Sequence, residues 1–152
     1  MPLSSLRRPV AAALLAALTV TGSAACSASS PEVSVTAGAA AAQAPAPGAE
    51  LDATEFAAAL RRPGTTIIDV RTPQEFAEGH LPGAVNIDVS SPDFTAQVSG
   101  LDPSAPYAVY CRSGNRSAAA LAEMGSLGFT GAYHLGGGIG AWQDAGGEVV
   151  TG

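Results

Sequence analysis

Cys111 and the residues that follow it form the part of the chain best suited to covalent chemistry. The apolar segment 107–110 (Tyr-Ala-Val-Tyr) leads directly into Cys111, and an Ala-rich segment of helical character begins at Ser117. This order predicts a buried strand, a tight loop and a helix N-terminus, with the thiol at the end of the strand. Backbone N–H groups of such a loop and the positive end of the helix dipole both favour a thiolate. Because the thiolate is the nucleophilic form, the segment predicts a reactive cysteine.

The loop after Cys111 is small, polar and basic, as a site for an anionic sulfur requires. Its predicted anion-binding residues are Arg112, Ser113, Gly114, Asn115 and Ser117. Arg116 adds a fixed positive charge, and together with Cys111 it is a predicted catalytic residue. The Cys-x4-Arg spacing is one residue shorter than the Cys-x5-Arg loop of cysteine-dependent phosphatases, and such a loop would need an arginine at position 117. A shorter ring of amides suits one sulfur atom better than a phosphate.

Other ionisable residues are interpreted mainly as structural. A lone cysteine is itself more often a small apolar core residue, and only the neighbouring glycine and arginines favour the reactive interpretation of Cys111. Asp69 and Arg71 are expected on the same rim, where Arg71 adds positive potential or, the interpretation we favour, pairs with Asp69 as scaffold. His80 and His134 are expected to make structural hydrogen bonds, because a preformed thiolate needs no general base. No pair of Cys and His residues has the spacing of a metal site, so we expect neither a metal nor another cofactor.

The elements that must position these residues alternate between strands and helices. Thr72 is the expected N-cap of one helix, with Pro73 at its first position and Glu75 as capping-box partner. Strands are predicted at 65–70, 84–87, 107–110 and 132–135, and helices at 51–61, 72–79, 91–98, 117–127 and 139–144. The alternation predicts an α/β fold with a parallel sheet and helices on both faces. Ligands of such sheets bind beyond the carboxyl ends of the strands, which is where Cys111 stands.

Three segments resemble the single-domain rhodanese family of sulfurtransferases. The loop 110–117 (YCRSGNRS) is similar to its active-site loop, and residues 67–88 (IIDVRTPQEFAEGHLPGAVNID) are similar to its amino-terminal signature. Residues 135–147 (LGGGIGAWQDAGG) resemble its carboxy-terminal Gly-Gly…Trp segment. These glycines do not fit a Gly-x-Gly-x-x-Gly nucleotide loop, so they are interpreted as a turn and a close-packing device, with Trp142 in the core.

The resemblance implies a rhodanese-like fold over residues 50–152 and a sulfurtransferase activity. In this family a cysteine, here Cys111, carries sulfane sulfur as a persulfide between a donor such as thiosulfate and an acceptor such as cyanide or a thiol. Two alternatives stay open: a non-catalytic binding module of the same fold, and a thiol redox protein. Retention of Cys111 and Arg116 argues against the first, and the lack of a second cysteine in the domain argues against an intramolecular version of the second.

The first 25 residues have the features of an export signal. Arg7 and Arg8 precede a short apolar run, and small residues precede Cys26. The run is too short to span a bilayer comfortably. The segment resembles a bacterial lipoprotein signal, which implies lipidation of Cys26 and anchoring on the outer face of the cell membrane. Ser23 departs from the leucine usual there, and ordinary signal peptidase cleavage, giving a secreted or periplasmic protein, is the alternative.

Composition limits the remaining possibilities. Residues 26–49 are almost free of large apolar side chains and are expected to be a disordered tether. The chain of 152 residues suits one domain, and its net charge of −6 without a single lysine argues against a nucleic-acid partner. We expect a monomer. Because Cys26 lies outside the domain, Cys111 is expected to be an unpaired thiol.

Overall fold

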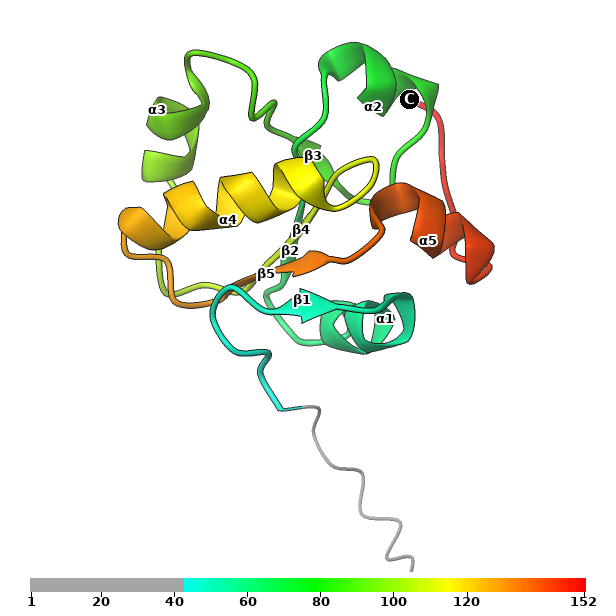
Figure 1. Cartoon of the computed structure of the whole chain (residues 1–152), viewed down its shortest axis with the longest axis horizontal. Helices are drawn as coiled ribbons and strands as arrows, with labels where there is room; N and C mark the ends of the chain where they lie inside the picture. The colour runs from blue at the N-terminus through cyan, green and yellow to red at the C-terminus, as the bar shows by residue number, and fades with distance from the viewer. Residues whose placement is uncertain (1–42) are drawn as a thin grey trace, which may run out of the picture. The chain divides into compact units, whose positions relative to one another are not determined.

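A parallel sheet forms the centre of the domain in the computed structural model, which describes residues 43–152 (Figure 1). The expected signal segment, Cys26 and most of the expected tether lie outside these residues. The described part holds five strands in the order β1-β5-β4-β2-β3, and every neighbouring pair is parallel. The strands are β1 (Glu50–Leu51), β2 (Thr66–Asp69), β3 (Val85–Asn86), β4 (Tyr107–Tyr110) and β5 (Ala132–Leu135).

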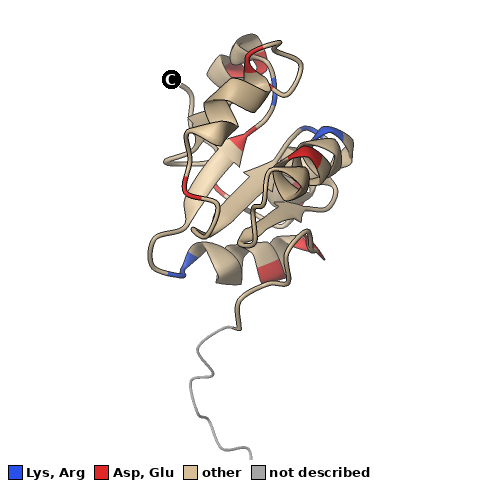
Figure 2. Ribbon diagram, turned by 90° about the vertical axis from the view of Figure 1, so that its left-hand side faces the viewer, with Lys and Arg blue, Asp and Glu red and all other residues tan. Residues whose placement is uncertain are grey.

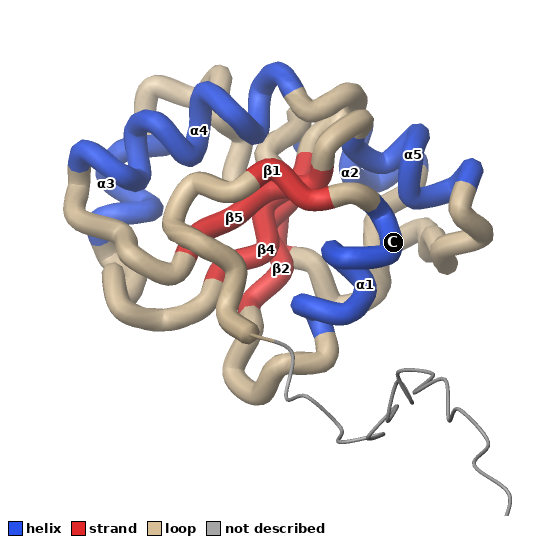
Figure 3. Tube along the Cα trace, turned by 60° about the horizontal axis from the view of Figure 1, so that its bottom comes forward, coloured by secondary structure: helices blue, strands red, loops and turns tan. Residues whose placement is uncertain are grey.

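Helices cover both faces of this sheet, as predicted. They are α1 (Ala53–Leu60), α2 (Pro73–Glu78), α3 (Phe94–Ser99), α4 (Asn115–Ser126) and α5 (Gly138–Asp144). Residues of α3 and α4 pack on one face against Ile68 and Val109, while α1 and α5 pack on the other face against Ala108 and Tyr133. Figure 3 shows α3 and α4 on one side of the strands and α1 on the other. Side chains of opposite parity along the strands therefore belong to two separate core clusters.

The start of the domain differs from the prediction of a helix over 51–61. Glu50 and Leu51 form the edge strand β1 beside β5, and the helix begins only after Asp52. The Asp52 side chain accepts a hydrogen bond from the Glu55 N–H at 2.8 Å, and the Asp52 N–H donates to the Glu55 carboxylate at 3.1 Å, so a capping box starts α1. The chain before a cap is extended, which leaves it free to pair with a strand. Backbone contacts to β5 reach back to Gly48, whose N–H donates to the Ala132 carbonyl.

The elements next to the reactive cysteine largely match the prediction. β4 and β5 have the expected bounds, and Thr72 caps α2 with Glu75 in a capping box and Pro73 in the first turn. The helix after the loop starts at Asn115, two residues before the expected position, because Gly114 serves as its N-cap with a φ of 95°. Among residues 43–152 no helix is long and apolar enough to cross a membrane.

Charged residues are distributed over separate elements of the domain. The arginines of the described part are Arg61, Arg62, Arg71, Arg112 and Arg116. Arg61 and Arg62 are adjacent in the chain, Arg71 and Arg112 line one depression, and the blue segments of Figure 2 form no continuous basic stripe. A surface that binds nucleic acid needs such a stripe to neutralise successive phosphates.

Candidate active site

Cys111 lies at the carboxyl end of β4, the middle strand of the sheet. All four residues of β4 are buried, and Cys111 itself is only 1% exposed. The loop that follows lies at the end of the sheet where α4 begins, near α2 and α5 (Figure 1). The site therefore occupies the position at which open parallel sheets bind their ligands.

Gly114 turns the loop so that a backbone amide faces the sulfur. Its N–H donates to Cys111 Sγ at 3.1 Å. This turn requires the left-handed backbone, with a φ of 95°, and a Cβ at this position would stand 3.2 Å from the Gly137 nitrogen. Glycine adopts the conformation without a steric penalty, so the sequence Cys-Arg-Ser-Gly folds locally into an amide cradle.

Hydrogen bonds outweigh burial in setting the charge of the sulfur. Burial raises the pKa of the Cys111 thiol, but donation from the Ser117 hydroxyl and from the N–H groups of Ser117, Ser113 and Gly114 brings the pKa below its ordinary value. The Ser117 Oγ lies 3.6 Å from Sγ. The N-terminus of α4, a helix of 12 residues, adds positive potential at the same point. The site thus favours a buried thiolate.

The glycine-rich segment before α5 packs directly against the backbone of the loop between β4 and α4, residues 111–114, called the reactive loop below. The Ile139 N–H donates to the Cys111 carbonyl at 2.8 Å. A Cβ on Gly138, whose φ is 61°, would lie 2.4 Å from the same carbonyl oxygen. The prediction of a turn and close-packing device is confirmed. Trp142 contacts Phe56 edge to face and donates from Nε1 to the Glu148 carbonyl at 2.8 Å.

Arg116 is held by Glu75, and its charge also interacts with Cys111. Two guanidinium nitrogens donate to the two Glu75 carboxylate oxygens, each at 2.7 Å. The hydrogen bond to Arg116, ahead of those from Thr72, lowers the pKa of Glu75 to about 2 against the opposing effect of burial. The pair joins residues 41 positions apart, and no local pattern identifies it. Sequence reasoning found only the capping role of Glu75.

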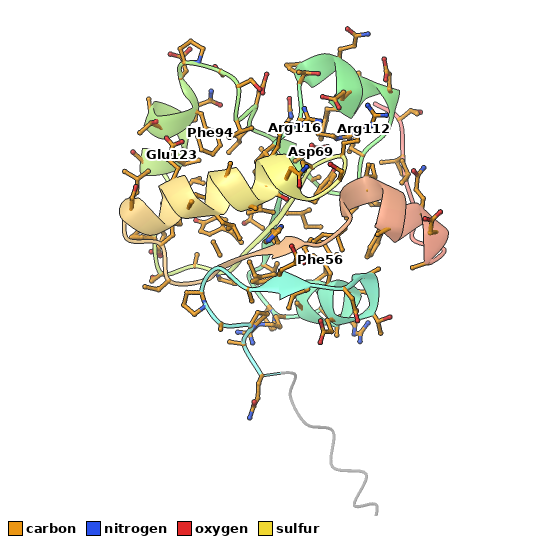
Figure 4. All side chains as sticks on the ribbon, in the orientation of Figure 1. Phe56, Asp69, Phe94, Arg112, Arg116 and Glu123 are labelled. Atoms are coloured by element: carbon orange, nitrogen blue, oxygen red, sulfur yellow. The ribbon has the colours of Figure 1, made fainter. Side chains whose placement is uncertain are left out.

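Asp69 and Arg71 pair with each other inside the domain. The closest contact, from Arg71 Nη2 to Asp69 Oδ2, is 2.6 Å, and the same Nη2 donates to the Gly79 carbonyl at 2.6 Å. Both side chains are nearly inaccessible to solvent, so the pair holds the chain after β2 to the end of α2. Figure 4 shows Asp69, Arg112 and Arg116 gathered where α4 begins.

A depression on the surface lies beside the reactive loop, and Arg112 forms part of its wall. Ser113 and Asn115 are also exposed, whereas Gly114 and Ser117 are buried beside the sulfur. The residues that line the depression are Arg71, Glu75, Glu78, Arg112, Ile139, Gly140 and Gln143. An arginine in the wall of a depression raises the positive potential there.

The two histidines differ in their relation to the site. His80 makes structural contacts, as expected: its ring stacks on Phe76 at 3.7 Å, and Nδ1 lies 2.9 Å from the Phe76 carbonyl oxygen. His134 is buried in β5, with Nδ1 3.1 Å from Ser117 Oγ. Sequence reasoning did not connect His134 with Cys111, because the contact depends on β5 lying next to β4. Residues 43–152 contain no group of three Cys, His, Asp or Glu side chains able to hold a metal ion.

Comparisons with known proteins agree on one family. Residues 52–145 match the model of the rhodanese-like domain. The chain is 39% identical over 90 residues to the thiosulfate sulfurtransferase GlpE of Pseudomonas entomophila, covering 59% of this chain and 80% of that protein. It is 40% identical over 92 residues to the protein of the same name from Pseudomonas aeruginosa, covering 60% of this chain and 81% of that protein.

Solved structures give the same result for the fold. The crystal structure of a rhodanese-related protein from Thermoplasma volcanium superposes with a TM-score of 0.61 at 31% identity, covering 68% of this chain and 99% of that chain. A thiosulfate sulfurtransferase from Pseudomonas aeruginosa superposes with a TM-score of 0.57 at 30% identity. That match covers 68% of this chain but 19% of the other.

Proposed function

The chain belongs to the rhodanese-like domain family, and from this premise we propose that it is a thiosulfate sulfurtransferase whose nucleophile is Cys111. The observation that carries the proposal is the sulfur itself, buried at the end of β4 and bonded by the Gly114 N–H and the Ser117 hydroxyl. This environment stabilises an anion on sulfur and leaves the loop open to the surface at Arg112.

In the first half-reaction the Cys111 thiolate attacks the outer sulfur of thiosulfate. A sulfur–sulfur bond forms to Cys111 while the bond within thiosulfate breaks, and sulfite leaves with the bonding electron pair. The product is a Cys111 persulfide with its negative charge on the outer sulfur. Backbone N–H groups of residues 112–117 receive that charge in the proposed mechanism, which is supported by the donation of Ser113, Gly114 and Ser117 N–H groups to the sulfur.

In the second half-reaction a nucleophile removes the outer sulfur. Cyanide attacks it, the persulfide bond breaks, and thiocyanate leaves while Cys111 returns to the thiolate. A thiolate acceptor reacts in the same way and becomes a persulfide itself. No proton transfer is needed in either half-reaction, because the attacking and the leaving groups are both anions.

Intact mass spectrometry of the protein, before and after thiosulfate and then cyanide, tests this cycle. We expect a gain of one sulfur atom (~32 Da) that cyanide removes and that a folded Cys111→Ser variant lacks, because only the thiolate forms the covalent intermediate. No gain with thiosulfate or any other sulfane donor would instead favour the binding module. A Cys111 found in a mixed disulfide rather than a persulfide would favour the redox protein.

For the location of the protein we propose export and lipidation of Cys26. The charged start, the short apolar run and the small residues before Cys26 support it, and the residues concerned precede the described part of the chain. Expression with a labelled fatty acid is expected to label the wild-type chain in the membrane fraction and to leave a Cys26→Ser variant unlabelled. A wild-type chain that is unlabelled and released into the medium or periplasm would favour ordinary signal peptidase.

We also propose that the domain acts as a monomer. Within residues 43–152 the large apolar side chains that are exposed are Val85 and Leu127, which leaves little apolar surface for a stable interface. Light scattering across a concentration series is expected to give the monomer mass throughout, and a mass that rises with concentration would contradict the proposal.

A further inference from the structure

His134 is a buried ionisable side chain that neither half-reaction uses. It is 4% exposed, and its Nδ1 contacts the Ser117 hydroxyl at 3.1 Å. The same hydroxyl oxygen lies 3.6 Å from Cys111 Sγ. A continuous chain of polar contacts therefore runs from β5 through Ser117, in the first turn of α4, to the nucleophile.

The Ser117 hydroxyl has a single proton and three neighbours that accept one. These are Cys111 Sγ, the Gly114 carbonyl oxygen at 2.9 Å, and His134 Nδ1 when that nitrogen carries no proton. The Gly114 carbonyl already accepts the Ala118 N–H at 2.9 Å, so it does not depend on the hydroxyl. The thiolate gains most from the proton, because hydrogen bonds to an ionised acceptor are roughly twice as strong as neutral ones.

The protonation of His134 decides which acceptor receives this proton. If Nδ1 is protonated, it donates to Ser117 Oγ and the hydroxyl proton stays available to Sγ. If the neutral ring carries its proton on Nε2 instead, Nδ1 competes with the thiolate for the hydroxyl proton. The partner of Nε2 is Glu50 Oε2 at 3.5 Å, on a side chain that is 70% exposed. A contact that long to a solvated carboxylate is worth little, so the buried thiolate prevails.

We propose that His134 is a positioning residue for the nucleophile: its Nδ1–H holds the Ser117 hydroxyl so that the hydroxyl donates to Cys111 Sγ. The proposal rests on Cys111 acting as a thiolate in the proposed function. It adds β5 to the elements that build the active site, since β4, the loop and α4 supply the other groups.

Among residues 43–152, charged groups on two neighbouring elements act on these side chains. Glu50 from β1 faces the His134 ring, and Arg116 from α4 interacts with the Cys111 charge at longer range. Burial lowers the pKa of His134, and Glu50 opposes this only in part, so the ring is neutral at physiological pH and its tautomer is the variable that matters.

The experiment measures the ionisation of Cys111 in the full chain without any sulfur donor. The rate of alkylation by iodoacetamide is followed against pH, and the Cys111 peptide is quantified by mass spectrometry so that Cys26 does not contribute. The variants are His134→Leu, which removes the donor; His134→Asn, whose side-chain amide places an N–H near the position of Nδ1; and Ser117→Ala. Tyr133→Phe is the matched control, because Tyr133 packs on Phe56 at the opposite face of β5.

We expect His134→Leu to raise the thiol pKa by about one unit and to slow alkylation about tenfold below that pKa, as loss of one bond to a charged group implies. His134→Asn and Tyr133→Phe are expected to keep the wild-type profile. In a Ser117→Ala background His134→Leu is expected to add no further shift. An unshifted profile in folded His134→Leu, or an equal shift in His134→Asn, would overturn the proposal.

Nitrogen NMR of the wild-type ring provides a measurement that needs no variant. At a pH where Cys111 is ionised we expect the Nδ1 signal to be that of a protonated nitrogen, and an unprotonated Nδ1 would refute the assignment. Neither readout involves sulfur transfer. A protein that shows both expected results but forms no persulfide would contradict the proposed function and leave the role of His134 intact.

Discussion

At the scale of single residues, the chemistry depends on how one buried sulfur becomes an anion. An isolated charge in the interior is costly, and burial by itself would keep Cys111 protonated. The Gly114 N–H and the Ser117 hydroxyl reverse this balance because both donate directly to Sγ. Donors fixed by the fold stabilise the thiolate before any substrate arrives, so a general base is not needed to form it.

The pH dependence of the first half-reaction should follow this balance. We expect single-turnover sulfur loading from thiosulfate to rise with pH through the pKa of Cys111 and to level off below the range of an ordinary thiol, since that pKa is lowered. Ser117→Ala should move the midpoint upward, because the hydroxyl donor is lost. A wild-type midpoint at or above that of a free cysteine peptide would contradict the picture.

At the scale of elements, the ion pair between Glu75 and Arg116 fastens α2 to the start of α4. Both side chains are partly buried, at 26% and 32% exposure, and the contact is bidentate. Such a pair fixes geometry as well as contributing energy. The role of Arg116 is thus to hold the loop at its helix end, while its charge still acts on Cys111 at longer range.

Glu75→Gln should destabilise the domain by about 1–2 kcal/mol at pH 7, a value discounted for the partial exposure of the pair. The folded-state pKa of about 2 lies below the ordinary value of 4.5. The contribution of Glu75 is therefore present above the ordinary value and is lost as the pH falls toward 2. Urea unfolding at pH 7 and pH 3 measures this difference, which should shrink at the lower pH.

Glu78→Gln is the matched control on the same helix. Glu78 is exposed, and the hydrogen bond that it accepts from Gln74 lies at the surface, so its replacement should change stability little at either pH. If both variants lost the same free energy of unfolding, the effect would come from removing a negative charge from α2 and not from breaking the pair with Arg116.

The contact between α5 and the reactive loop also acts at the scale of elements. Gly138→Ala places a Cβ 2.4 Å from the Cys111 carbonyl oxygen and forces alanine into a φ of 61°. We expect a loss of about 2–3 kcal/mol and slower persulfide formation, because the backbone of the loop must move. Gly140→Ala is the control, since its Cβ would lie 3.9 Å from the Arg112 carbonyl oxygen, an ordinary contact. Thermal unfolding and single-turnover kinetics compare the two variants. Equal stability and equal rates of persulfide formation would exclude a steric clash at Gly138 as the cause.

At the scale of the whole molecule, the edge strand β1 closes one side of the sheet. Besides the strand pairing itself, its segment adds hydrogen bonds to β5 from Gly48 N–H to the Ala132 carbonyl, from His134 N–H to the Ala49 carbonyl, and from Gly136 N–H to the Leu51 carbonyl. The family match begins at residue 52. Strand β1 is therefore part of the folded domain although it precedes the matched segment.

Two truncations test the contribution of β1. A chain that starts at Asp52 should be less stable than one that starts at Pro47 by at least about 2–3 kcal/mol, given a net contribution of about 1 kcal/mol for each backbone hydrogen bond lost. It should also aggregate more, because the edge of β5 becomes available for pairing. Urea unfolding and light scattering provide the measurements. Two chains of equal stability would show that β1 is dispensable.

Sequence by itself determined the parts of this protein that depend on near neighbours. The apolar run 107–110, the following Cys111 and the small residues up to Ser117 identify strand, loop and helix, since alternation, turn residues and caps act over a few positions. The Thr72–Glu75 capping box and the bounds of β4 and β5 were predicted on the same basis, and the structure confirms them. Resemblance of three segments then indicated the family, which the comparisons show.

Only the tertiary structure decided which of these elements are neighbours. Consecutive strands β1 and β2 lie apart in the order β1-β5-β4-β2-β3, and nothing within one segment encodes that order. The Glu75–Arg116 pair, the His134–Ser117 contact and the pairing of β1 with β5 all follow from it. Pairing between distant segments is chosen by burial of the whole core, because each strand satisfies its hydrogen bonds equally well with several partners. His134, which was expected to be structural, comes into contact with Ser117 beside the sulfur only through that arrangement.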